Sequence, residues 1–118
     1  MEIKYKSKKV EGQCTNLKIA RKEFQEFGKD VLGKINIIKS ASNFYDVMKY
    51  SPFNCDALKG NLKNYWALDV KGRKSPWRFI VAPIDENDDI INLSEEFCAQ
   101  AKTLEVILIE EVSKHYEH

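Results

Sequence analysis

Two runs of aromatic, β-branched and other apolar residues lie close together near the middle of the chain, at residues 65–70 and 76–83. Such residues favour a pleated, half-buried strand. The five residues between the runs include Gly72, which can adopt the positive φ of a tight turn. The sequence therefore predicts a β-hairpin here, and the rest of the chain has to pack around it.

The second strand of this hairpin has two different faces. Side chains alternate along a strand, so Trp77, Phe79 and Val81 share one face while Arg78 and Ile80 share the other. The aromatic face is expected to meet helices. Arg78 should then point out of the opposite face, where a strand gives a functional cation a rigid mount.

The N-terminal half is predicted to begin with a short edge strand at residues 2–6, where polar and apolar residues alternate. A loop is expected at residues 8–12, and Thr15 or Asn16 is the predicted cap of the first helix. Apolar residues then recur at helical spacing as far as Gly28, which is a predicted stop. They are Leu17, Ala20, Phe24 and Phe27.

A second helix is predicted from about residue 29, and a short third one at residues 42–48 with Ser42 as its cap. Ser51 and Pro52 should end the third. The apolar face of the second helix consists of Val31, Leu32, Ile35, Ile38 and Ala41. The apolar faces of these helices are expected to form a layer against the sheet.

The C-terminal half is predicted to be mostly strand. Residues 55–59 are predicted to form a short strand. Residues 103–112 are the most β-like run, and within it residues 106–109 are apolar on both faces, as in an interior strand. Residues 84–97 contain six acids and no base. They do not follow the spacing of a calcium-binding loop, so a solvated loop is preferred, with a helical turn from Asn92 or Ser94.

Helices therefore come early and meandering strands late, which is typical of the α+β class. With 118 residues and 43% hydrophobic composition, the chain is expected to form a single domain over residues 1–118. We predict an N-terminal strand and two to three helices, packed on one face of a small antiparallel sheet. The other face should be open.

Positive charge is concentrated around the hairpin. The stretch from Lys59 to Arg78 carries six positive side chains and a single acid, Asp69, although the net charge of the chain is only +1. A cationic sheet face attracts a polyanion, and RNA or DNA is the obvious candidate. The six residues are Lys59, Lys63, Lys71, Arg73, Lys74 and Arg78.

The remaining composition indicates a cytoplasmic protein without a metal or another cofactor. Cys14, Cys55 and Cys98 are widely spaced and odd in number, which favours reduced thiols over disulfides or zinc. No apolar run is long enough to cross a bilayer, and the first residues do not resemble a signal peptide. No membrane partner is expected.

These residue types could support metal-independent RNA cleavage. A base would take the proton of the ribose 2′-OH, cations would stabilise the phosphorane, and an acid would protonate the leaving 5′-oxygen. Arg73 and Arg78 offer planar forks for phosphate and Lys59 a point charge. His115 and Tyr116 could exchange protons or stack on a base.

The same residues carry a resemblance to a known family. Leu58-Lys59-Gly60, Tyr65-Trp66-Ala67-Leu68, Gly72-Arg73-Lys74 and Trp77-Arg78-Phe79 resemble the core motifs of RelE/ParE-superfamily toxins. The chain is most similar to the HigB-like branch of type II toxin–antitoxin systems. Residues 13–24 and 111–117 are similar to the first helix and the tail of that branch.

The resemblance implies an endoribonuclease that cuts translated mRNA on the ribosome. It also implies a helix-turn-helix, HigA-like antitoxin as partner, with operator DNA contacted only through that antitoxin. The catalytic residues it implies are Lys59, Arg73, Arg78, His115 and Tyr116. Lys63, Lys71 and Lys74 are expected to attract RNA rather than to take part in chemistry.

The tail departs from the family pattern. Many relatives end in Asp-Tyr-His, whereas this chain has Ser113-Lys114-His115 followed by Tyr116, and Asp56 stands near the position of a family histidine. Two alternatives stay open. One is a ParE-like protein that poisons DNA gyrase by protein contact, and the other is an inactive relative that only binds RNA.

Overall fold

The computed structural model describes residues 1–93 and 98–114 of the chain. It has the expected α+β architecture, with a five-stranded sheet of order β1-β5-β4-β3-β2. Its strands are β1 (Glu2–Tyr5), β2 (Asp56–Ala57), β3 (Trp66–Asp69), β4 (Trp77–Pro83) and β5 (Val106–Lys114). Its α-helices are α1 (Lys8–Thr15), α2 (Leu17–Phe24), α3 (Gly28–Ser40), α4 (Phe44–Lys49) and α5 (Cys98–Ala101). Three short 3₁₀ turns are η1 (Gln25–Phe27), η2 (Ser51–Phe53) and η3 (Gly60–Leu62).

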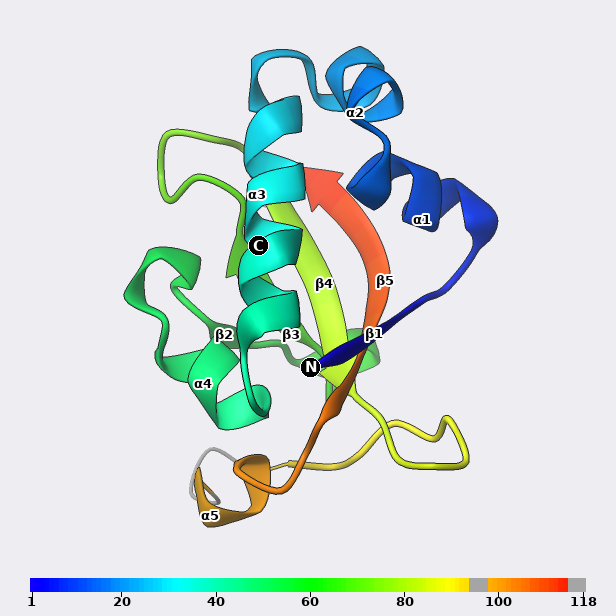
Figure 1. Cartoon of the computed structure of the whole chain (residues 1–118). Coiled ribbons are helices and arrows are strands. Elements are labelled where there is room, and N and C mark those ends of the chain that lie inside the picture. Colours follow the sequence, from blue (N-terminus) through cyan, green and yellow to red (C-terminus); the bar gives the residue numbers. More distant parts are fainter. Residues whose placement is uncertain (94–97, 115–118) are drawn as a thin grey trace.

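Helices cover one face of the sheet. Figure 1 shows α3 lying across that face, with α1 and α2 towards one end and α4 towards the other. Trp66, Phe79 and Ile107 are buried on the sheet side of this layer, and Phe24 and Phe44 on the helix side. The rings of Phe24 and Trp77 meet edge to face with their centroids 4.7 Å apart. The predicted apolar layer between helices and sheet is thus confirmed.

The sheet is mostly antiparallel, as predicted, with one parallel pair that the sequence did not predict. β2, β3, β4 and β5 pair antiparallel in turn, but β1 pairs parallel with β5. Parallel partners need a long crossover, and here nearly the whole chain lies between them. β1 is an edge strand and β5 an interior strand, as predicted.

The predicted loop at residues 8–12 is wrong, because these residues belong to helix α1. The Ser7 hydroxyl caps this helix by accepting a hydrogen bond from the backbone N–H of Val10 at 3.2 Å. Val10 and Cys14 are buried against the core. This burial outweighs the low helix propensity of Gly12, so tertiary packing decides the local structure.

Gly28 begins α3 rather than ending a helix. α2 ends at Phe24, and Gln25 turns the chain with a φ of 54° into η1. A Cβ at Gly28 would lie 2.7 Å from the backbone nitrogen of Arg21, so the helices approach too closely for any side chain there. The glycine is needed for helix packing.

Asparagine side chains cap two of the helices. Asn16 caps α2 as predicted, since its side-chain oxygen accepts from the N–H of Ile19 at 3.1 Å. α4 is capped by Asn43 rather than Ser42, through a hydrogen bond from the N–H of Asp46 at 3.0 Å. Of the predicted helical turn after Asn92, residues 94–97 lie outside the described residues.

The start of the acidic segment is an exposed loop that folds on itself. Asp85 Oδ1 accepts hydrogen bonds from the backbone N–H groups of Asn87 and Asp89. Asp88 forms an exposed ion pair with Lys4 at 2.5 Å. All three cysteines lie in the described part of the chain, and none forms a disulfide. Within residues 1–93 and 98–114, no helix has both the length and the apolar character needed to cross a bilayer.

Candidate nucleic-acid interface

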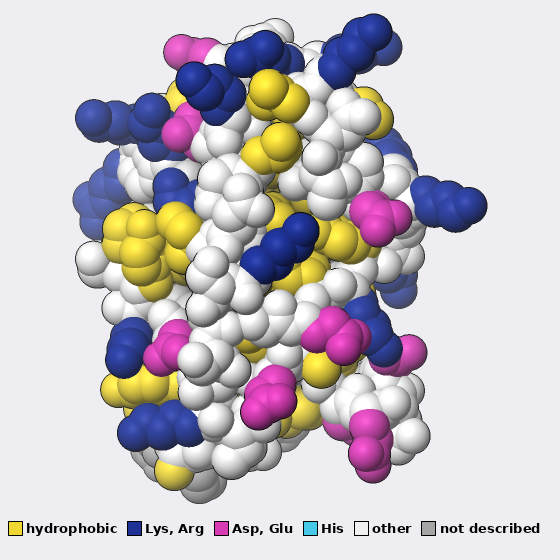
Figure 2. Space-filling view, in the orientation of Figure 1, with side chains coloured by type: hydrophobic (Ala, Val, Ile, Leu, Met, Phe, Trp, Pro, Cys, Tyr) yellow, Lys and Arg dark blue, Asp and Glu magenta, His cyan; other side chains and the backbone are white. Residues whose placement is uncertain are grey.

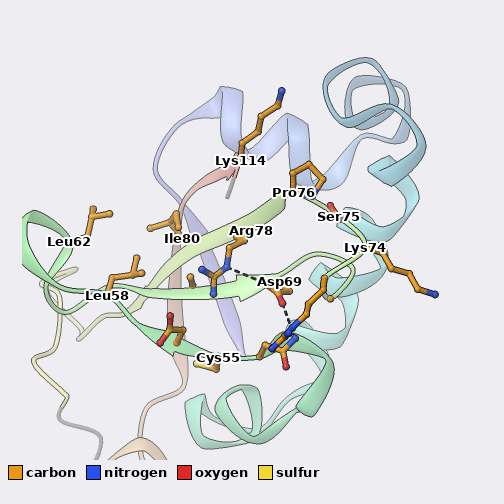
Figure 3. Close-up of a pocket in the computed structure, with 15 residues that line it drawn as sticks. Cys55, Leu58, Leu62, Asp69, Lys74, Ser75, Pro76, Arg78, Ile80 and Lys114 are labelled. Atoms are coloured by element: carbon orange, nitrogen blue, oxygen red, sulfur yellow. Dashed lines mark hydrogen bonds and ion pairs between the residues drawn. The ribbon is translucent and has the colours of Figure 1, made fainter. Parts of the chain in front are cut away.

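A cleft of about 1020 Å³ opens on the sheet face that the helices do not cover, and Figure 3 shows the residues that line it. One end is polar and contains Asn54, Asp69, Arg73, Lys74 and Arg78. The other end is apolar, with Leu58, Leu62, Ala67 and Ile80. The cleft thus joins charged groups for an anion to an apolar wall on which a flat ring could lie.

Strand register explains why Arg78 and Ile80 reach the cleft. Residues directly opposite in an antiparallel pair share a face. Arg78 is opposite Asp69, and Ile80 is opposite Ala67. Phe79, between them, belongs to the buried core. The predicted two-faced character of this strand is confirmed.

Arg78 does not stand alone in the cleft. Its Nε lies 3.0 Å from Asp69 Oδ1, and the exposed fractions of the two side chains are only 14% and 10%. The angle at Nε–H falls outside that of a hydrogen bond, so the contact is an ion pair. The second oxygen, Asp69 Oδ2, accepts a hydrogen bond from the Asn54 amide at 2.8 Å. Asp69, the partner of Arg78, is therefore fixed in position by Asn54.

The turn between β3 and β4 is fixed from the helix side. Lys71 pairs with Asp30 of α3 at 3.5 Å, and Lys34 Nζ of α3 donates to the backbone oxygen of Val70 at 2.9 Å. Gly72 has a φ of 55°, which allows the chain to reverse. Arg73 and Lys74 follow it and line the cleft.

The structure therefore brings together only part of the predicted site. Arg73, Arg78 and Lys74 line one cleft, whereas Lys71 is directed to α3. Lys59 and Lys63 are exposed at the two ends of η3 and are not among the described residues that line the cleft. Figure 3 shows the side chain of Lys74 pointing away from Arg78.

His115 and Tyr116 lie outside the described residues. β5 ends at Lys114, which is next to His115 in the chain and lines the rim of the cleft. Lys114 Nζ lies 5.7 Å from the centre of the Trp77 ring, within the range of a cation–π contact. Figure 3 shows this side chain pointing away from Arg78 as well.

Sequence reasoning missed five polar residues of the cleft: Asn54, Asp56, Asp69, Ser75 and Lys114. Asp69 did carry a signal, because it is the single acid in the basic stretch and lies on the strand paired with that of Arg78. Asn54 carried none, since it reaches Asp69 only through the tertiary fold. With these residues included, four cations and two carboxylates line the described part of the cleft.

Cations are not confined to this face. Figure 2 shows Lys and Arg side chains spread over the helix-covered face, mainly in its upper half. Exposed examples on α1 and α2 are Lys8, Lys9, Lys18, Arg21 and Lys22. The prediction that the open face carries the positive charge is thus correct for the cleft and wrong for the molecule as a whole.

A carboxylate lies at an irregular point of β5. Ile80 pairs with Glu111 and Val81 with Ile109, so Glu110 is an extra residue in a β-bulge. Its Oε2 atom is buried and has no hydrogen-bond partner among the described residues. Burial raises the pKa of the Tyr65 phenol, and the negative charge of Glu110 raises it further. In the part described, no group of three or more His, Cys, Asp or Glu side chains could hold a metal ion.

Neither a family model nor a curated protein matches the chain. The resemblance to RelE/ParE toxins therefore rests on the quoted motifs and stays a prediction. What the geometry shows on its own is a cleft with two guanidinium groups from neighbouring parts of one hairpin.

Proposed function

We propose that this protein is a cytoplasmic toxin of the RelE/ParE type, most similar to HigB, which binds mRNA on the ribosome and cleaves it. The observation that carries the proposal is the cleft on the uncovered sheet face, where Arg73 and Arg78 line a single site next to the end of β5. A HigA-like antitoxin would neutralise the toxin.

The chemistry needs no metal. A base removes the proton of the ribose 2′-OH, whose oxygen attacks the adjacent phosphorus while the bond to the 5′-oxygen breaks. A proton passed to that oxygen gives a 5′-hydroxyl end, and the other product carries a 2′,3′-cyclic phosphate. Arg73 and Arg78 would stabilise the negative charge of the phosphorane, and His115 is the group suited to proton transfer near neutral pH.

The Arg78–Asp69 ion pair favours a second candidate, an RNA-binding relative without catalytic activity. A guanidinium that is already paired at 3.0 Å has part of its charge compensated before any phosphate arrives. RNA binding would persist in such a protein, but cleavage would not occur.

Expression without an antitoxin tests the proposal. We expect growth arrest and new 5′-hydroxyl ends within the reading frames of mRNA. Arg73→Ala should abolish both, because it removes a cleft cation from a turn. Lys71→Ala is the matched control from the same turn, since Lys71 pairs with Asp30 instead, and it should retain both.

The alternatives give different results. Intact mRNA together with RNA binding by the purified protein would favour the inactive relative. DNA damage without mRNA cuts would indicate a gyrase poison and contradict the proposal.

A further inference from the structure

Asp69 and Arg78 form a pair that is nearly withdrawn from solvent, at the polar end of the cleft. The exposed fractions of their side chains are 10% and 14%. A charged group in such a place is costly unless its partners are fixed. Both oxygens of Asp69 are used, one by Arg78 Nε at 3.0 Å and one by the Asn54 amide at 2.8 Å.

Asn54 is itself held by the fold. It follows η2 and has a left-handed backbone, with φ of 44° and ψ of 52°. The preceding residue, Phe53, is fully buried, and its ring packs against Tyr50 with centroids 4.9 Å apart. Asn54 is itself exposed, but its backbone is fixed by the buried neighbour Phe53, so Asp69 accepts a hydrogen bond from a part of the chain outside the hairpin.

The contact uses only one edge of the guanidinium. Arginine has five N–H donors, and Asp69 approaches the Nε side. Figure 3 shows the other two nitrogens of Arg78 directed away from Asp69, towards the side of the cleft where Leu58 and Leu62 lie. This is the orientation needed to present a two-pronged donor to a phosphate.

We propose that Asp69 is a positioning residue, which fixes the Arg78 guanidinium so that its outer edge faces RNA phosphate, and that Asn54 holds Asp69 in place. The inference rests on the proposed function, since it assigns a role within the same cleft. Under this inference the Arg78–Asp69 ion pair is part of the RNA-binding site, and its presence does not argue against RNA cleavage.

A competing interpretation is that Asp69 simply neutralises Arg78. The two interpretations predict opposite signs for Asp69→Asn, which keeps the shape of the side chain and removes its charge. If Asp69 only neutralises, RNA affinity should rise, because the cleft becomes one unit more positive. If Asp69 positions Arg78, affinity should fall although the charge has improved.

The experiment measures binding of a short single-stranded RNA to the full chain by fluorescence anisotropy. Asp88→Asn is the matched control, because it makes the same change of charge in an exposed ion pair with Lys4 on the far edge of the sheet. We expect Asp69→Asn to weaken binding by about tenfold or more, since a small misplacement of a binding group has large effects. Asp88→Asn should leave affinity within about twofold or strengthen it slightly.

Two further measurements separate positioning from loss of fold. The NMR order parameter of the Arg78 Nε group should be high in the wild type and lower in Asp69→Asn, because the ion pair no longer restrains the side chain, with the backbone spectrum retained. Asn54→Gly removes the amide that donates to Asp69, while glycine keeps the left-handed backbone and the charge is unchanged. This variant should therefore also weaken RNA binding.

The outcomes separate the inference from the proposed function. Tighter or unchanged binding by folded Asp69→Asn overturns the inference alone. If Asp69→Asn does not fold, unchanged binding by Asn54→Gly overturns it. A wild-type protein that binds no RNA overturns the proposed function and the inference with it.

Discussion

At the scale of single residues, the direction of a side chain was predictable and its partner was not. Alternation along the strand placed Arg78 on the uncovered face, which the structure confirms. Its contact with Asp69 depends on the register between two strands, and the contact of Asp69 with Asn54 depends on how η2 packs. The position of Asp69 as the single acid in the basic stretch hinted at the first contact, but the sequence carries no local signal for the second.

Cys14 gives a prediction about pH at this scale. Burial raises the pKa of its thiol from 9.0 to about 12. The thiol of the unfolded chain loses its proton from about pH 9, while the folded one keeps it. The unfolded state therefore binds fewer protons than the folded state between pH 9 and 12, and stability falls as pH rises, by up to about 1.4 kcal/mol per pH unit.

Urea denaturation at several pH values from 8 upward measures this effect. Cys14→Ala should flatten the decline in the free energy of unfolding, whatever its effect at neutral pH. Cys98→Ala, which alters an exposed thiol, should leave the slope of the wild type unchanged. Parallel curves for all three proteins would contradict the assignment.

At the scale of elements, periodic patterns located strands and long helices well. The hairpin, the interior C-terminal strand and α3 lie where alternation and helical spacing placed them. α1 was missed because its Gly12 and clustered lysines look like a loop, whereas the cap by Ser7 and the burial of Val10 and Cys14 stabilise it as a helix. The parallel pairing of β1 with β5 could not be foreseen, since no short-range pattern reports a partner so distant in sequence.

Two glycines of α3 give a prediction about packing. Gly28→Ala places a Cβ within 3.0 Å of three backbone atoms of Ala20 and Arg21, which cannot move aside as a flexible side chain would. We expect a loss of about 1–3 kcal/mol in the free energy of unfolding.

Gly33→Ala is the matched control, because nothing lies within 4 Å of its added Cβ. It should be neutral or stabilise the helix by up to about 1 kcal/mol, since alanine has the higher helix propensity. Chemical denaturation measures both variants. Equal effects of the two substitutions would mean that α2 and α3 do not approach as closely as described.

At the scale of the whole molecule, helices cover one sheet face and leave the other with a cleft of mixed character. The α+β class and this division into two faces followed from the order and periodicity of the elements. The distribution of charge over the two faces could be predicted only in part from the sequence. It depends on which lysines the fold directs towards the helices, as it does Lys71 towards Asp30. Half of the six basic residues singled out in the sequence line the cleft; Arg73, Lys74 and Arg78 are these three.

The central claim is that the uncovered face of the sheet is the surface that meets RNA. Titration of isotope-labelled protein with a short single-stranded RNA, followed through backbone amide shifts, tests it most directly. We predict that the largest changes fall on cleft residues such as Asn54, Asp69 and Arg78, while Val31 and Ile35 of α3 stay unchanged. Changes centred on the basic helices α1 and α2, with the cleft unaffected, would contradict the account.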